Sequence, residues 1–189
     1  DNTSLLTKID FSFSENKILL NYGSSFFTYL CLIVLLISSN MFDGINLQSF
    51  VFYFLNFVFL YFIYPNIFAL TCCFSLIIFG FLNSRGKIFL GDSGVYILST
   101  ILSILYIKYY NFNIDSISAD AVFSFLFFPV LDACRCILMR VLKGKNPFYG
   151  DQSHFHHILL RKFSYFNSLL IIIIFLLVFF IFYFLNNTS

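Results

Sequence analysis

Three histidines fall within four residues, in the run His154-Phe155-His156-His157. Imidazole nitrogens can bind a metal ion or a phosphate oxygen, so the run predicts one of these two kinds of site. No cysteine accompanies the histidines at metal-ligand spacing, which makes zinc the weaker interpretation. From this pattern alone, the histidines can also be a chance run on a solvated loop without a function.

Two aspartates stand beside glycine in short polar segments next to apolar runs. Asp43-Gly44 follows one such run, and Asp92 lies between Gly91 and Gly94 where the next run begins. A helix N-terminus suits an anion, and a carboxylate at this place can instead hold Mg²⁺ together with phosphate oxygens. Taken singly, each aspartate is equally well explained as a helix cap.

Asp132 and Arg135 interrupt an otherwise apolar segment at a spacing of three residues. Ionisable residues within membrane spans are expensive and are usually functional or paired. The spacing permits a mutual ion pair on one helix face. A structural pair and a catalytic role are therefore both open for these residues.

The composition indicates an integral membrane protein. Of the 189 residues, 60% are hydrophobic and 11% charged, with 30 Phe and 12 Tyr, and lipid is the solvent that accepts such a surface. The net charge of +2, without a basic stripe, argues against nucleic-acid binding. The cysteines lie in apolar runs and are interpreted as buried thiols.

Apolar stretches long enough to approach a membrane span occur six times, and no alternating pattern suggests a barrel. The expected fold is all-α, a polytopic membrane helix bundle of about six transmembrane helices in a single domain, 1–189. The stretches are 25–39, 47–64, 66–82, 94–110, 119–140 and 166–185.

Alternating spans place the polar segments 40–46, 83–93 and 141–165 on one side of the membrane. Eight of the eleven Lys and Arg residues belong to that side or the adjacent helix end. The positive-inside rule therefore orients these loops toward the cytoplasm, in a multi-pass protein of the cytoplasmic (inner) membrane.

The carboxylates, histidines and basic residues thus converge on one membrane face. Carboxylates for a metal ion and basic groups for phosphates are the equipment of phosphoryl transfer at a membrane interface. A transporter subunit would instead place ionisable residues near mid-membrane, where these segments are almost purely apolar.

Four segments, in order and spacing, resemble the polyprenyl-phosphate N-acetylhexosamine-1-phosphate transferase family, also called glycosyltransferase family 4. Residues 40–46 (NMFDGIN) and 89–94 (FLGDSG) are similar to its two glycine-aspartate loops. Residues 129–135 (PVLDACR) are similar to its Pro-x-x-Asp-x-x-Arg helix, and 145–157 to its histidine loop. Members start O-antigen, teichoic-acid and peptidoglycan lipid intermediates.

The resemblance implies transfer of N-acetylhexosamine-1-phosphate from a UDP-sugar (UDP-N-acetylhexosamine) to a polyprenyl phosphate such as undecaprenyl phosphate. UMP would be released, with Mg²⁺ (or Mn²⁺) as the cofactor. It implies catalytic roles for Asp92, which would also bind the metal, and Asp43. Substrate binding is implied for the remaining matched polar residues: Asn40, Asn46, Arg135, His154, His156 and His157. A homodimer, and the choice between covalent and direct displacement, stay open.

Departures from the family pattern are also informative. Asn46 stands where a second Asp is usual, Leu47 replaces a Gly, and Val95 replaces a Ser. The family carries an upstream Asp-Asp pair, and this chain has none. The resemblance therefore covers the C-terminal portion of such an enzyme, and we expect the chain alone to be inactive. An inactive remnant of the family is the alternative.

Overall fold

The computed structural model describes residues 5–14, 16–112, 117–147 and 152–187. Helices make up most of this part of the chain, after a short antiparallel pair of strands, β1 (Lys8–Ile9) and β2 (Ile18–Leu19), and a 3₁₀ turn at Asn21–Gly23. The helices are α1 (Ser24–Phe42), α2 (Gln48–Ile63), α3 (Ile67–Ser84), α4 (Gly91–Phe112), α5 (Ala119–Leu142), α6 (Phe155–Lys162) and α7 (Tyr165–Asn187).

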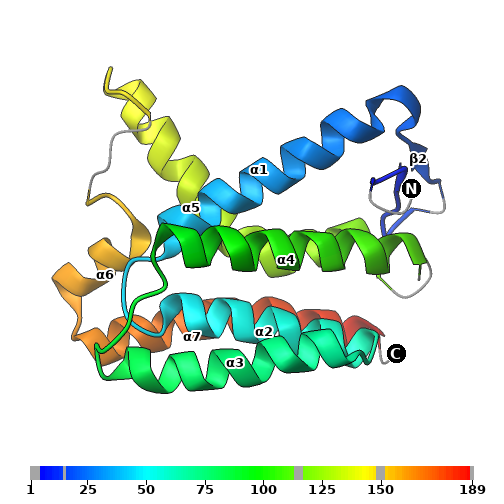
Figure 1. Ribbon diagram of the computed structural model, residues 1–189. Coiled ribbons are helices and arrows are strands. Elements are labelled where there is room, and N and C mark those ends of the chain that lie inside the picture. Colours follow the sequence, from blue (N-terminus) through cyan, green and yellow to red (C-terminus); the bar gives the residue numbers. More distant parts are fainter. Residues whose placement is uncertain (1–4, 15, 113–116, 148–151, 188–189) are drawn as a thin grey trace.

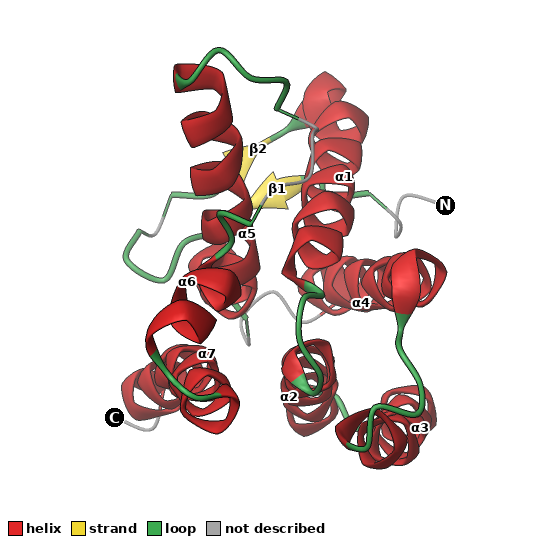
Figure 2. Ribbon diagram, turned by 90° about the vertical axis from the view of Figure 1, so that its left-hand side faces the viewer, coloured by secondary structure: helices red, strands yellow, loops and turns green. Residues whose placement is uncertain are grey.

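Helices α2, α3 and α7 run side by side, with α4 against them, while α1 and α5 cross each other above this group (Figure 1). Figure 2 looks onto the end of the bundle where the connections α1–α2, α3–α4 and α5–α6 all lie. The three polar segments expected to share one side of the membrane therefore meet at one end of the molecule. Strands β1 and β2 lie at the opposite end (Figure 1).

Glycines end two of the helices that lead into this polar end. After α3, Gly86 adopts φ +65°, its N–H bonds to the Asn83 carbonyl, and the next N–H reaches Leu82. After α5, Gly144 adopts φ +63° with the same pair of bonds, to Val141 and Arg140. This is the Schellman motif, which favours glycine because it needs a left-handed residue.

Aromatic side chains and a few buried hydrogen bonds hold the helices together. Phe59 of α2, Phe125 of α5 and Phe180 of α7 pack against one another, with ring centroids 3.8 to 5.7 Å apart. Between α2 and α4, the Tyr106 hydroxyl donates to Asn56 Oδ1 at 2.6 Å in a fully buried position. Such bonds between membrane helices are worth roughly 0.6–2 kcal/mol each.

Three helical segments are long and apolar enough to cross a membrane: Asn21–Phe42, Ile67–Ser84 and Ala119–Leu142. Helix α2 (Gln48–Ile63) is apolar but shorter, α4 is long enough but less apolar, and α7 is apolar from Tyr165 to Ile181. The all-α membrane fold is thus supported, while the expected number of six spanning helices is not confirmed.

Helix α6 is an addition to the expected fold, since its residues fall within the polar segment 141–165. Its eight residues bury His156 and Leu159 and end on Arg161 and Lys162. Part of the histidine-loop motif, Phe148 and Asp151, lies outside the described residues.

Candidate active site

A cavity of about 600 Å³ opens at the polar end of the bundle. Its wall combines the last turn of α1, the start of α4, the second half of α5 and the beginning of α6. Lining residues are Ile37, Asn40, Met41, Asp43, Gly44, Tyr96, Ile137, Arg140, Pro147, His154, His156 and His157. Segments separated by more than a hundred residues thus form one polar chamber.

Asp43 lies on the cavity wall, directly after α1. Its Oδ1 accepts a hydrogen bond from the Ser49 hydroxyl at 2.6 Å, which fixes the carboxylate from the first turn of α2. Burial raises the pKa of the Asp43 carboxyl; the Ser49 bond opposes this, and the negative charge of Asp92 adds to the rise. The negative charges of Asp43, in the α1–α2 connection, and Asp92, at the start of α4, therefore repel each other.

Asp92 is exposed in the first turn of α4, one helical turn before Tyr96, which lines the cavity. Its neighbour Gly91 has φ +64°, a left-handed conformation that suits glycine at this helix start. Asp92 does not itself line the cavity, but its charge is close enough to raise the pKa of Asp43.

His156 is a buried imidazole in this wall, only 2% exposed. Its Nδ1 has no hydrogen-bond partner within the part of the chain that the structure describes. The ring occupies the space where a side chain at Gly44 would begin, so a larger residue at position 44 would displace His156. Burial and the neighbouring His157 and His154 lower the pKa of His156 to about 4, which keeps the imidazole neutral at physiological pH.

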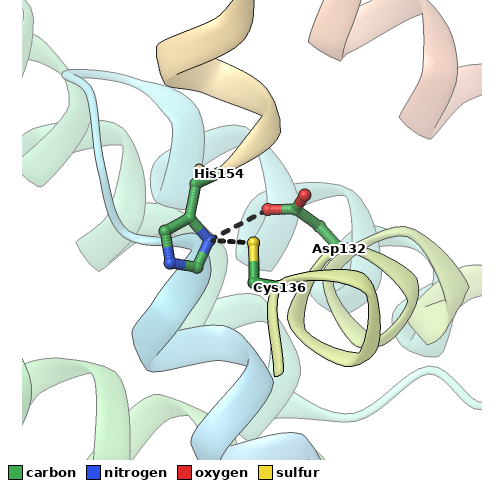
Figure 3. A group of neighbouring side chains, drawn as sticks. All are labelled: Asp132, Cys136 and His154. Carbon is green, nitrogen blue, oxygen red and sulfur yellow. Dashed lines mark hydrogen bonds and ion pairs between the residues drawn. The ribbon is translucent and has the colours of Figure 1, made fainter. Parts of the chain in front are cut away.

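His154 and Asp132 fasten the histidine segment to α5 (Figure 3). Asp132 Oδ2 receives a hydrogen bond from His154 Nδ1 at 3.1 Å, and Oδ1 receives one from Arg135 Nη2 at 2.7 Å. The backbone N–H of Phe155 also donates to this carboxylate, at 3.1 Å, so Asp132 caps the start of α6. Arg135 in turn donates to the Ser153 carbonyl at 2.5 Å.

The spacing of Asp132 and Arg135 is compatible both with a structural pair and with a role in catalysis. The structure supports the structural pair, because Asp132 and Arg135 form the ion pair expected from their spacing. Both side chains also form hydrogen bonds to the backbone between α5 and α6. Arg135 does not line the 600 Å³ cavity, so its expected contact with substrate finds no support in this arrangement.

Arg140 is a functional candidate that sequence reasoning passed over. It lies in the last turn of α5, is 4% exposed, and lines the cavity. Its Nη2 lies 3.3 Å from His154 Nε2, and its Nη1 donates to the Pro147 carbonyl at 2.9 Å. Because a guanidinium only donates, His154 Nε2 accepts and its proton sits on Nδ1, facing Asp132. The sequence does contain a signal for Arg140: it is a basic residue in a segment expected to span the membrane. Burying a charge there is costly, so such residues are usually paired or functional.

Asp132, Cys136 and His154 bring their potential metal-binding atoms within 4.8 Å of one another. A carboxylate, a thiol and an imidazole are donors that zinc accepts. Here, however, both carboxylate oxygens already accept hydrogen bonds, and two guanidinium groups approach the cluster, Arg135 at Cys136 Sγ (3.4 Å) and Arg140 at His154. We therefore assign the cluster as a hydrogen-bonded clamp.

Asn83 ties two of the polar loops together from a buried position at the end of α3. Its Oδ1 accepts from the Leu47 N–H at 2.6 Å, and its Nδ2 donates to the Ile88 carbonyl at 2.8 Å. Leu47 adopts φ +67°, the left-handed conformation that glycine favours, at the position where the family pattern has glycine.

Five of the eight expected site residues line the cavity: Asn40, Asp43, His154, His156 and His157. Asp92 lies outside the lining, one helical turn before the lining residue Tyr96. Asn46 does not line it; its carbonyl accepts from the Tyr165 hydroxyl at 2.7 Å, and its side chain lies near Gly86. The roles assigned to these residues stay predictions.

Asp43 and Asp92 are the carboxylates that could hold the Mg²⁺ ion expected from the sequence. Mg²⁺ is usually held by one or two carboxylates, several waters and the phosphates of the substrate. Two carboxylates whose charges repel each other, one of them in a cavity with basic and imidazole groups, would be donors of that kind.

The apolar helices and the polar cavity at their shared end define a membrane protein with a site at one surface. Residues 3–110, more than half of the chain, match the family model glycosyl transferase family 4, and the chain belongs to that family. The match includes Asp43 and Asp92.

Similar curated proteins bear one name, undecaprenyl-phosphate alpha-N-acetylglucosaminyl 1-phosphate transferase. The protein from Salmonella typhi is 29% identical over 82 residues, 43% of this chain and 22% of its own length. The Thermotoga maritima protein is 30% identical over 83 residues, which are 44% of this chain and 27% of its own length. The Escherichia coli K12 protein is 27% identical over 82 residues. The matched segment thus spans about a quarter or less of these relatives.

Proposed function

We propose that the protein takes part in transfer of N-acetylhexosamine-1-phosphate from a UDP-sugar to a polyprenyl phosphate, with release of UMP. The observation that carries the proposal is the meeting of Asp43, Arg140 and the three histidines around one cavity at the end of an apolar helix bundle, with the charge of Asp92 close enough to act on Asp43. Family membership and the name of the relatives point to the same chemistry.

In this reaction an oxygen of the lipid phosphate forms a bond to the sugar-bearing phosphorus, and the bond between the two phosphates of the donor breaks. UMP leaves with the electron pair of that bond. Mg²⁺, when bound, supplies charge neutralisation of the diphosphate, and Asp92 and Asp43 are the residues that would hold it.

The other cavity residues would bind the donor phosphates. Arg140 presents a guanidinium whose orientation is fixed by Pro147 and His154, as positioning of phosphates requires. Neutral His156 would offer a nitrogen that can donate to a phosphate oxygen from one side of its ring.

The bilayer location gives the two substrates a common meeting plane. A polyprenyl chain would lie in the lipid beside the helices while its phosphate reached the cavity. On the expected orientation this plane is the cytoplasmic surface of the inner membrane, where the nucleotide sugar is available.

The first test measures binding of UDP-N-acetylglucosamine to the detergent-solubilised chain with and without Mg²⁺. We expect Mg²⁺-dependent binding that Asp92→Asn weakens at least about tenfold, the effect of one charged contact worth about 1.4 kcal/mol. The matched control is Asp120→Asn, which lies at the opposite end of the bundle beside Ser12. Equal affinity of the Asp92 and Asp120 variants would contradict the proposed site.

The second test follows UMP release in membranes that carry the complete gene product. We expect release to depend on both Mg²⁺ and undecaprenyl phosphate and to be lost in Asp92→Asn. Release of free sugar phosphate without the lipid acceptor would show a hydrolase instead.

A further inference from the structure

A second cavity, of about 250 Å³, lies at the end of α5 on the far side of the Arg140 side chain. It is built by the last turns of α5, the residues that follow, and α6. Its lining residues are Arg135, Met139, Arg140, Lys143, Lys145, Gln152, Ser153, Ile158 and Arg161. Five of these nine side chains are basic, and none of the described lining residues is acidic.

Within the part of the chain that the structure describes, some of this positive charge has no paired carboxylate. Arg135 is paired with Asp132. Among the described residues, the Arg161 guanidinium donates to the neutral carbonyl and amide oxygens of Gln152, at 3.3 and 3.4 Å. Lys143 and Lys145 are exposed and form no ion pair with any carboxylate in the described ranges. An anion with room for several basic partners would balance this arrangement.

The surroundings of the cavity indicate what kind of anion it would be. Lys143 directly follows the last residue of a helix that is long and apolar enough to cross a membrane, which would place the cavity at head-group depth. On the same end of α5, Leu138 is 59% and Leu142 72% exposed, which offers an apolar surface for an acyl chain just below the basic groups. A phosphate joined to a hydrocarbon chain fits both surfaces.

We propose that this second cavity binds the phosphate of an acidic membrane phospholipid, such as phosphatidylglycerol, with an acyl chain along α5. Basic clusters next to membrane helices gain about 1 kcal/mol per Lys or Arg from anionic lipid, which is roughly a fivefold change in affinity. The site is separate from the transferase cavity, because the two share only Arg140 as a lining residue.

The test is native mass spectrometry of the chain released from nanodiscs that contain equal amounts of phosphatidylglycerol and phosphatidylcholine. We expect retained phosphatidylglycerol on the unaltered chain and roughly 30-fold weaker retention for Lys143→Gln/Lys145→Gln. The matched control is Arg85→Gln/Lys87→Gln, which removes two charges at the same membrane end but outside the cavity. Thermal unfolding of both variants verifies that the fold is kept.

Four results would overturn the proposal. The first is unchanged phosphatidylglycerol retention in the double-lysine variant, and the second is an equal loss in the control, which would indicate attraction to the surface as a whole. The third is equal retention of phosphatidylcholine. The fourth is displacement of phosphatidylglycerol by undecaprenyl phosphate or inorganic phosphate at equal concentration, which would assign the cavity to a substrate or to a soluble anion.

Discussion

Single side chains at the polar end differ in whether they contact the cavity or hold its wall. His156 belongs to the first group, because its ring lines the cavity and its Nδ1 has no partner among the described residues. Asp132 belongs to the second, since its oxygens are fully engaged by His154, Arg135 and the start of α6. This difference predicts distinct effects of substitution.

His156 should make the folded state sensitive to acid. Its pKa is lowered from 6.5 to about 4 in the fold, so the unfolded chain binds a proton more readily. Stability is therefore fully present above about pH 6.5 and falls as the pH is lowered toward 4, by up to about 3 kcal/mol. Unfolding of the detergent-solubilised chain across this range checks the prediction. In His156→Gln this part of the pH dependence should disappear, and an unaltered slope would contradict the assignment.

Asp132→Asn should destabilise the α5–α6 connection. The change leaves the partly exposed Arg135 guanidinium without its ion-pair partner, and losing a hydrogen bond to a charged group costs about 1.5–3 kcal/mol. Proteolysis within residues 143–154 should become faster while the other loops stay protected. Asp120→Asn is the control, and similar cleavage in both variants would argue against the clamp.

Between the helices, the contact of Asn83 with Leu47 fixes the backbone of the α1–α2 connection. The Leu47 backbone is held at φ +67° because its N–H donates to Asn83. A left-handed conformation costs a side-chain-bearing residue roughly 1–2 kcal/mol relative to glycine.

Leu47→Gly should therefore be more stable than Leu47→Ala by about 1 kcal/mol. Both variants remove the leucine side chain, so their difference isolates the backbone conformation. Thermal unfolding of the two variants in the same detergent measures it. If the alanine variant were equally stable, residue 47 would not be strained in solution.

The elements also show how far sequence reasoning reaches. The segments 47–64 and 66–82 predicted α2 and α3 closely, because Pro65 cannot continue a helix and Asn66 caps the next one by accepting from the Ala69 N–H. Helix α6 was not predicted, since its eight residues are polar on average and its start is capped by Asp132 through a tertiary contact.

The candidate site was predictable only in part, for the same reason. Asp43 and the histidines were found because glycine, aspartate and histidine stand out in apolar surroundings. Arg140 was not, because its placement between Pro147 and His154 depends on how the chain returns from α5 to α6. The wall that Arg140 forms is a property of the packed molecule.

For the whole molecule, polar contacts between α2 and α4 hold together helices that are otherwise bound by aromatic packing. Tyr106→Phe removes the donor to Asn56 Oδ1 and leaves that amide oxygen buried. We expect a loss of about 1–2 kcal/mol in unfolding free energy, measured in detergent. Tyr29→Phe, at an exposed position on α1, should change it little, and equal effects would mean that the buried bond contributes nothing.

Arg140 lines both cavities, one of which we assign to the nucleotide sugar and the other to a membrane lipid. A ligand in one cavity that moves this guanidinium also changes the position of a positive charge in the other cavity. Thermodynamic linkage then requires reciprocity: a lipid that alters donor affinity has its own affinity altered by the donor by the same factor. The lipid composition of the membrane would in that way act as an effector of the site, transmitted through one side chain.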